Sequence, residues 1–220
     1  MLKKTAFAFL KGLKKYNTKE WFDNNRDEYR EVYENFEAFT QDLINCISKF
    51  DQSIASSHLL AKDCIPRLNR DLRFTKDKSP YKTYLYAVIS SGGRKSGNAV
   101  YYVMLDPGKC CFGAGSFQPD PDKLKKLRQE IDYNLEEWIK IAEEPVFKTA
   151  FPDGIIAQES LRKVPNGFDA DSPAANFLKM KGFFVRQYYA DSFFLKKDNF
   201  DVIVERLKTC VDLNTFVNRV

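Results

Sequence analysis

The densest set of charged side chains in this sequence lies within residues 67–82, which read RLNRDLRFTKDKSPYK. Six basic residues stand against two acidic ones there, so the window carries +4 of the chain's net charge of +5. Arginine binds a phosphate or carboxylate through two parallel hydrogen bonds, and lysine binds it as a point charge. A local excess of cations of this size favours an anion-binding site.

Most of this window is a candidate for contact with an anionic ligand. The candidate residues are Arg70, Asp71, Arg73, Lys76, Lys78, Tyr81 and Lys82. We expect the cations to contact the anion, Asp71 to orient an arginine and Tyr81 to form one wall of the site. Ser79 and Pro80 fit the N-cap and first position of a helix, and its free N–H groups would face the same anion.

The same charges have a second interpretation, in which they pair with one another. Asp71 would then bind Arg73 or a distant cation, and Asp77 would cap a turn. The protein would in that case be a non-enzymatic interaction protein, with this window as a structural element or docking surface. For the first interpretation a small or phosphorylated ligand is the leading candidate. Nucleic acid is the weaker candidate, because the rest of the chain carries little excess charge.

A third hypothesis is a metal-dependent phosphoester hydrolase. It requires Asp71, Asp77 and Asp106 to converge on a Mg²⁺ ion, and the sequence assigns no residue to a metal or cofactor with any specificity. The single histidine, His58, lies among serines, and the five cysteines contain no CxxC pair, which disfavours a zinc site. Neither glycine-rich segment fits a dinucleotide or P-loop motif.

The length of 220 residues favours a single domain over 1–220, and a subdivision near 118–150 is the alternative. An odd number of cysteines with one adjacent pair is typical of free thiols rather than a disulfide framework. No signal-peptide core and no long apolar run is present, so we expect a cytoplasmic protein without membrane contact. The composition leaves the oligomeric state open.

Hydrophobic periodicity predicts helices in the first fifty residues. One helix is expected over 5–15, and a second, longer one begins with Asn17 as N-cap and Glu20 at N3. Three short segments rich in β-branched and aromatic residues follow at 85–91, 99–106 and 109–117. Their turn-length connections predict an antiparallel meander.

The rest of the chain alternates helix and strand. Asp120 and Pro121 predict a helix start, and a further helix carries Trp138. A short strand is expected at 161–164, a helix from Ser172, a strand over 182–190 and a helix from Phe200 to the end. Strands grouped centrally, with a long N-terminal helix and C-terminal helices, predict an α+β fold around a mainly antiparallel sheet.

The window 70–82, RDLRFTKDKSPYK, also carries a family resemblance. It resembles the signature of the domain of unknown function 2461 family, uncharacterised bacterial and fungal proteins, with Thr75 in place of serine. Three other blocks agree: Glu20-Trp21-Phe22, Gly113-x-Gly115 with Pro119 and Arg128, and Val164-Pro165-x-Gly167-Phe168 with Pro173. The resemblance covers essentially the whole chain and implies no particular activity.

Overall fold

The computed structural model describes all 220 residues and is built on one four-stranded antiparallel sheet in the order β1-β2-β3-β4. Its strands are β1 (Leu85–Ile89), β2 (Val100–Leu105), β3 (Cys110–Ser116) and β4 (Phe183–Tyr189). The predicted meander and the predicted last strand are therefore confirmed. β4 joins the edge of the meander after a long helical excursion, pairing Ser116 with Phe183 and Cys110 with Tyr189.

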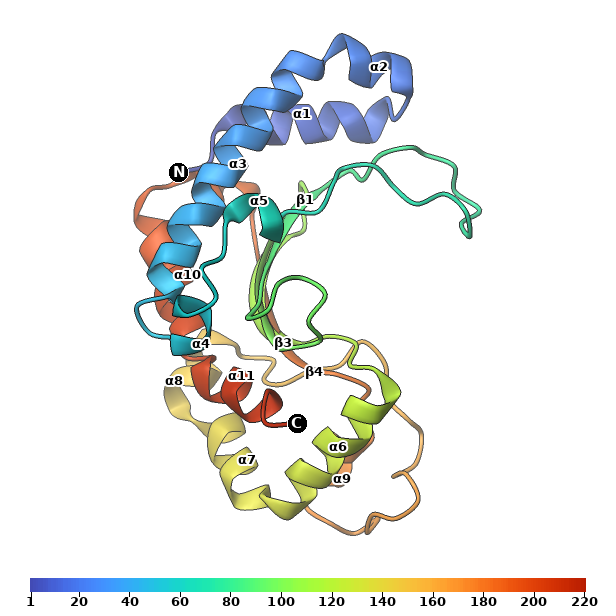
Figure 1. The fold of residues 1–220 in the computed structure, drawn as a ribbon, viewed down its shortest axis with the longest axis vertical. Helices are drawn as coiled ribbons and strands as arrows, with labels where there is room; N and C mark the ends of the chain where they lie inside the picture. Colours follow the sequence, from blue (N-terminus) through green and yellow to red (C-terminus); the bar gives the residue numbers. More distant parts are fainter.

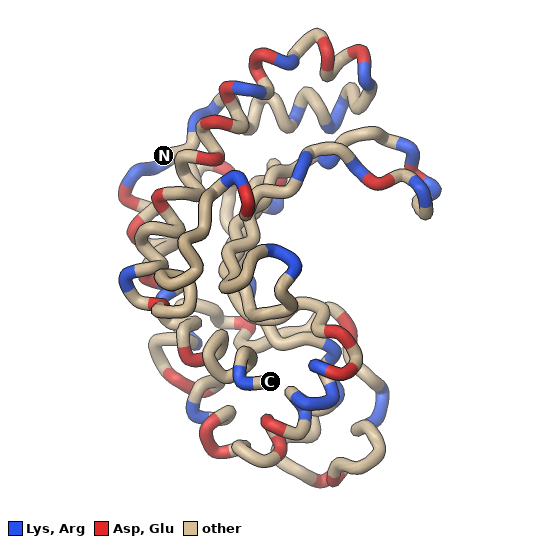
Figure 2. The backbone as a smooth tube through the Cα atoms, in the orientation of Figure 1, with Lys and Arg blue, Asp and Glu red and all other residues tan.

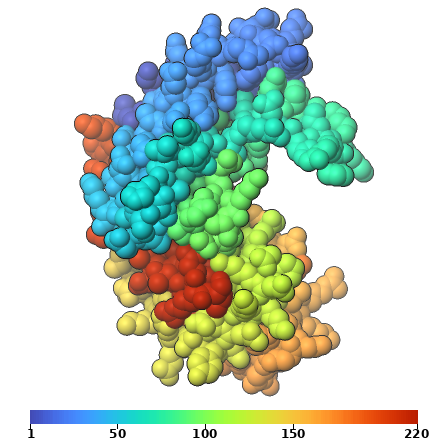
Figure 3. Space-filling model, viewed as in Figure 1, coloured from blue at the N-terminus to red at the C-terminus, as the bar shows by residue number.

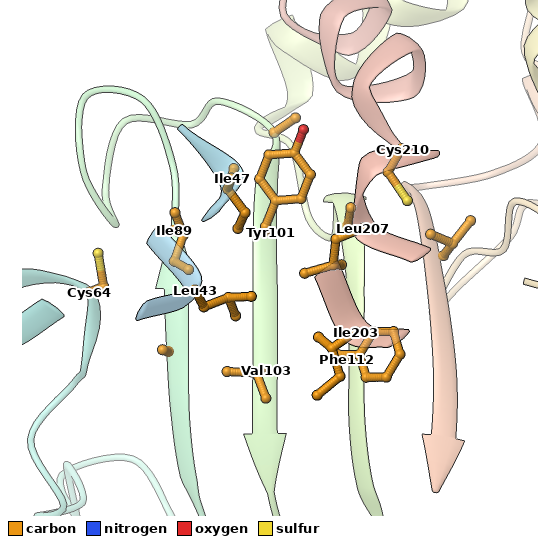
Figure 4. Packing of buried hydrophobic residues seen from close by; sticks show 14 of the residues in the cluster. Leu43, Ile47, Cys64, Ile89, Tyr101, Val103, Phe112, Ile203, Leu207 and Cys210 are labelled. Carbon is orange, nitrogen blue, oxygen red and sulfur yellow. The ribbon is translucent and has the colours of Figure 1, made fainter. Parts of the chain in front are cut away.

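One face of this sheet is covered by helices, and the fold is α+β as predicted. Helices α3 (Arg26–Ile47), α5 (Ala61–Cys64), α10 (Asp198–Lys208) and α11 (Val211–Val217) contact the sheet. Because side chains alternate along a strand, every second residue points at these helices. Figure 4 shows side chains of α3 and α10 over Tyr101, Val103 and Phe112. The apolar cluster that results runs from Leu2 to Val217.

The N-terminal helices differ from the prediction. α1 (Lys4–Lys15) is confirmed, but the expected long helix is divided into α2 (Lys19–Asn24) and α3, and its N-cap is Thr18 rather than Asn17. Asn25 breaks the chain direction by donating its side-chain amide to the Trp21 carbonyl at 2.7 Å. This break lets α2 fold back, so that the Trp21 ring lies directly over Gly12 of α1.

Short helices make up much of the remaining chain. They are α4 (Gln52–Ala55), α6 (Pro121–Tyr133), α7 (Leu135–Glu143), α8 (Pro145–Ala150), α9 (Ala175–Leu178) and the 3-10 helix η1 (Asp191–Leu195). Asp120 caps α6 as predicted, accepting hydrogen bonds from the backbone N–H groups of Asp122 and Lys123. The predicted helix around Trp138 is also confirmed, as α7.

Three predicted elements were wrong in detail. Residues 161–164 form no strand, because pairing there is limited to an isolated bridge between Ser160 and Met180. The helix expected from Ser172 begins only at Ala175. The C-terminal helix is two helices, separated at Cys210, a break that turns the fully buried Leu213 and Phe216 into the core.

The second face of the sheet looks into a hollow. In Figure 1, α3 and α10 lie on one side of the strands, and the segment that precedes β1 extends away on the other side. Figure 3 shows the surface indented between this segment above and α6 with its neighbouring loops below. None of the helices combines the length and apolar character needed to cross a membrane.

Candidate functional site

The signature window folds as a projecting loop, residues 68–82, which we call the arm (Figure 1). Its two limbs pair only near the body, at the bridge between Asn69 and Tyr81. No helix starts at Ser79, contrary to the sequence prediction. The Asp77 carboxylate instead accepts the Ser79 N–H at 2.9 Å, and the Pro80 carbonyl accepts the Arg70 N–H at 2.9 Å. These local hydrogen bonds replace those of a helical turn.

Tyr81 anchors the arm to the N-terminal helices. Its ring is buried and stacks on Phe22 with 4.3 Å between ring centroids. The Asn17 side chain donates to the Tyr81 carbonyl at 2.9 Å and accepts the Tyr81 N–H at 3.1 Å. The aromatic face of Tyr81 is therefore occupied by the protein itself.

The distal part, residues 71–78, is the arm tip, and most of its charges are paired locally. Arg73 binds Asp71 through two nitrogens, at 2.6 and 3.0 Å, and this hydrogen bonding lowers the pKa of Asp71. Lys78 donates to the Leu72 carbonyl at 3.0 Å, and Lys76 makes no polar contact. The tip also presents Phe74, whose side chain is 94% exposed. The internal pairing that the second interpretation requires is thus present at the tip.

Where the arm joins the body, cations gather with little compensation. We call this cluster the arm base: Arg67, Arg70, Lys82 and Arg94. Arg70 forms an ion pair with Asp77, which is the only ion pair in the cluster. Lys82 donates to the carbonyls of Arg67 and Asn69, at 2.6 and 3.0 Å. Arg94 comes from the β1–β2 loop and donates to the Asp63 carbonyl, and the side chain of Arg67 makes no hydrogen bond.

The arm base holds more positive charge than nearby carboxylates neutralise. The pKa of Lys82 is lowered, first by burial and then by Arg67, Arg70 and Arg94. A cation whose pKa falls because of like charges is one that a bound anion would stabilise. Of the predicted site residues, the structure therefore brings Arg70 and Lys82 together. The sequence did not predict that Arg94 belongs to this cluster. It lies far from the arm along the chain, and only the fold of the β1–β2 loop places it beside the arm.

A second polar group, also missed, lies on the face of the sheet that looks into the hollow. We call it the open-face trio: Tyr102 on β2, Cys111 on β3 and Arg186 on β4. Tyr102 and Cys111 are buried, yet both lie outside the main apolar cluster. Burial raises the pKa of Cys111 to about 11, and the charge of the nearby Arg186 opposes this rise. The thiol is therefore protonated at neutral pH and is not an activated nucleophile. Strand alternation at Tyr101-Tyr102 was the available signal, since adjacent residues point to opposite faces.

The carboxylates of the third hypothesis do not converge. Asp71 and Asp77 are each paired with an arginine of the arm, whereas Asp106 lies in the β2–β3 turn, 4.0 Å from Lys14 of α1. No three His, Cys, Asp or Glu side chains of the chain group as metal ligands.

A cavity of about 860 Å³ lies between α6 and the loop after residue 164. It is lined by Arg128 and by Pro165, Asn166, Gly167 and Phe168, which belong to two of the sequence blocks noted above. Arg128 donates to the Met180 carbonyl at 2.9 Å, and burial lowers its pKa. Its Nε atom is buried without a partner.

The protein thus has an α+β fold, with one antiparallel sheet covered by helices on a single face and a basic arm that projects from the body. The family model described as "Conserved hypothetical protein (DUF2461)" matches residues 5–216, and the chain belongs to this family. Comparison with curated proteins and with solved structures found no match.

Proposed function

We propose that this protein binds an anionic, phosphate-bearing ligand at the arm base. The observation that carries the proposal is the clustering of Arg67, Arg70, Lys82 and Arg94 with a single carboxylate in ion-pair contact. Placing like charges together lowers the stability of the folded protein, and proteins retain such arrangements mainly where a ligand supplies the opposite charge. Figure 2 shows how basic positions recur along the arm beside the hollow.

The arm base suits this role better than the arm tip. Arg73 at the tip already holds a carboxylate, so a ligand would have to displace Asp71. Arg67 and Arg94 have no acidic partner, and both are exposed to solvent. A phosphate group could accept hydrogen bonds from two or more of these side chains without breaking an existing ion pair.

Thermal denaturation in the presence of inorganic phosphate, pyrophosphate, nucleotides, sugar phosphates and short oligonucleotides tests the proposal. A ligand at about 100 times its Kd adds about 2.7 kcal/mol to the free energy of unfolding. For a chain of this length we expect a rise in Tm of roughly 5–10 °C.

Two pairs of variants locate the site. Lys82→Met and Arg67→Ala should abolish the rise in Tm, whereas the tip variants Arg73→Ala and Lys76→Ala should keep it. Loss of the rise in the tip variants alone would place the ligand at the arm tip. A rise that survives all four substitutions, or no rise with any anion, would contradict an arm site altogether.

We further propose a cytoplasmic location for this binding activity. All five cysteines are free thiols, and four of them are buried. Free thiols persist in reducing compartments, where disulfides are rare.

A second candidate function is docking to another macromolecule through the arm tip, and Phe74 favours it. Large apolar side chains are seldom so exposed at the end of a projecting loop. A photoreactive amino acid at position 74 should give specific crosslinks in cells, with position 133 as the matched control because Tyr133 is 89% exposed. Equal crosslinking at both positions would exclude specific docking by the tip.

A further inference from the structure

Two members of the open-face trio, Tyr102 and Arg186, lie in one row of the sheet. Tyr102 on β2 pairs with Gly113 on β3, and Gly113 pairs with Arg186 on β4. A Cβ atom at Gly113 would lie 2.8 Å from Cε1 of the Tyr102 ring, and it would also meet the Val185 carbonyl. The tyrosine ring therefore occupies the space that a side chain at position 113 would fill. It lies across β3, with Cys111 and Arg186 close to its hydroxyl.

Arg186 is held in place by the two residues that flank it on the same face of β4. Its guanidinium carbon lies 4.9 Å from the centroid of the Tyr188 ring and 5.6 Å from that of Phe184. Phe184 in turn stacks on Phe117, which packs edge-on against Tyr102. These aromatic contacts fix the positions of the arginine and tyrosine relative to each other.

Both of these side chains offer hydrogen-bond donors that have no acceptor. The Tyr102 hydroxyl and the Arg186 Nε are buried and make no hydrogen bond, and the Tyr102 side chain is only 8% exposed. Arg186 takes part in none of the ion pairs of the chain. Buried polar groups in proteins are almost always paired, so two adjacent unpaired donors indicate a missing acceptor.

We propose that Tyr102 and Arg186 form a binding site for an oxyanion, a carboxylate or phosphoryl group of a small-molecule ligand. One anion oxygen would accept the tyrosine O–H, and another would accept from the guanidinium. The Cys111 thiol lies beside them as a third, weak donor. Arginine supplies the charge that makes such hydrogen bonds strong, and the surrounding rings exclude water from them.

This site is separate from the arm base and goes beyond the proposed function. It lies on β2 and β4, whereas the arm base is built from the arm and the β1–β2 loop. A ligand can reach it from the hollow, because Tyr188 is 49% exposed and Arg186 is partly exposed.

The Arg186 Nε–H signal in the nitrogen–proton NMR spectrum reports directly on the proposed contact. Its assignment comes from its loss in Arg186→Lys. Inorganic phosphate and acetate are the two probes, titrated at constant ionic strength so that screening does not move the signal. We expect a saturable shift with at least one probe, and the tighter of the two identifies the ligand class as phosphoryl or carboxylate.

Tyr102→Phe is the decisive variant, because it removes one oxygen atom that makes no hydrogen bond in the free protein. It should leave Tm unchanged and weaken binding by about tenfold or more, as expected for a lost hydrogen bond to a charged group. Lys82→Met is the control that separates this site from the arm base, and it should leave the Arg186 shift unchanged.

Three results would overturn the inference. The first is an Arg186 signal that neither anion moves, and the second is an equal Kd for wild type and Tyr102→Phe. A shift that disappears in Lys82→Met would also overturn it, because the anion would then be acting from the arm base. The proposed function would stand in each of these cases if Lys82→Met still abolished the thermal shift.

Discussion

The two faces of the sheet differ in whether a buried tyrosine hydroxyl has a hydrogen-bond partner, as Tyr101 and Tyr102 show. Both side chains are buried, and they are neighbours on β2. On the covered face, Tyr101 belongs to the main apolar cluster, and its hydroxyl donates a hydrogen bond to Asp51 at 2.8 Å. On the open face, the Tyr102 hydroxyl has no partner.

The arm shows a parallel contrast, between charges that are neutralised and charges that are not. At its tip, Arg73 and Asp71 neutralise each other. At its base, Lys82 and Arg67 have no carboxylate partner, and burial with neighbouring cations lowers the pKa of Lys82. Selection for stability alone favours polar and charged groups that are paired within the protein. Groups left unpaired therefore indicate where a ligand would bind.

Replacing an aromatic side chain by alanine should give the largest difference in stability between the two faces. Phe112 on the covered face is fully buried against Phe151 and Tyr189. Phe112→Ala should lower the free energy of unfolding by about 3–5 kcal/mol in urea titrations. Tyr188→Ala on the open face should change it by no more than about 0.5 kcal/mol. Similar losses for both variants would show that the open face is packed as tightly as the covered one.

Removal of the two tyrosine hydroxyls tests the contrast at the level of single atoms. Tyr101→Phe removes the hydrogen bond to Oδ2 of the buried Asp51 carboxylate, whose Oδ1 keeps its bonds from Ser53 and Ile54, and should cost about 1–3 kcal/mol. Tyr102→Phe removes a hydroxyl that has no partner, and its stability should equal or slightly exceed that of wild type. Chemical denaturation of the matched pair measures both. A large loss in Tyr102→Phe would mean that its hydroxyl is already hydrogen-bonded, for example to water.

The arm base should give a characteristic dependence of stability on alkaline pH. The pKa of Lys82 is lowered from 10.5, so the unfolded chain binds more protons than the folded one between the folded-state pKa and 10.5. The Lys82 contribution to stability should therefore rise as pH rises toward 10.5. Tyrosines with raised pKa values act in the opposite sense, so the measured quantity is the difference between wild type and Lys82→Met. A difference that stays constant with pH would remove the electrostatic argument for the arm base.

The arm tip should show the smallest effect, in the acid range. Hydrogen bonds from Ser79, and then from Arg70, lower the pKa of Asp77 to about 2. Its contribution to stability is present above 3.8 and is lost as pH falls toward about 2. Carboxyl NMR titration should show a rise of this pKa in Ser79→Ala, which loses the hydroxyl hydrogen bond and keeps the backbone one, and also in Arg70→Ala, which loses the ion pair. An unchanged pKa in Ser79→Ala would assign the shift to the ion pair.

Much of the fold was predictable because its signals are local. Three segments rich in β-branched and aromatic residues, joined by turn-length connections, define the meander, and Asp120 defines the start of α6. The break at Asn25 was missed because the apolar periodicity continues on both sides of it. Only the packing of Trp21 over Gly12 requires the chain to turn there.

The candidate sites divide in the same way. The sequence by itself determined that positive charge is concentrated in residues 67–82, because charge is a property of residue type. Only the tertiary structure decided which of those charges are neutralised, since Arg73 meets Asp71 and Arg70 meets Asp77 through the local path of the chain. Tyr102 and Arg186 are 84 positions apart, and no spacing rule connects them. They meet because β4 pairs with β3 and because Gly113 between them has no side chain, which are facts of strand pairing that arise only in the folded sheet.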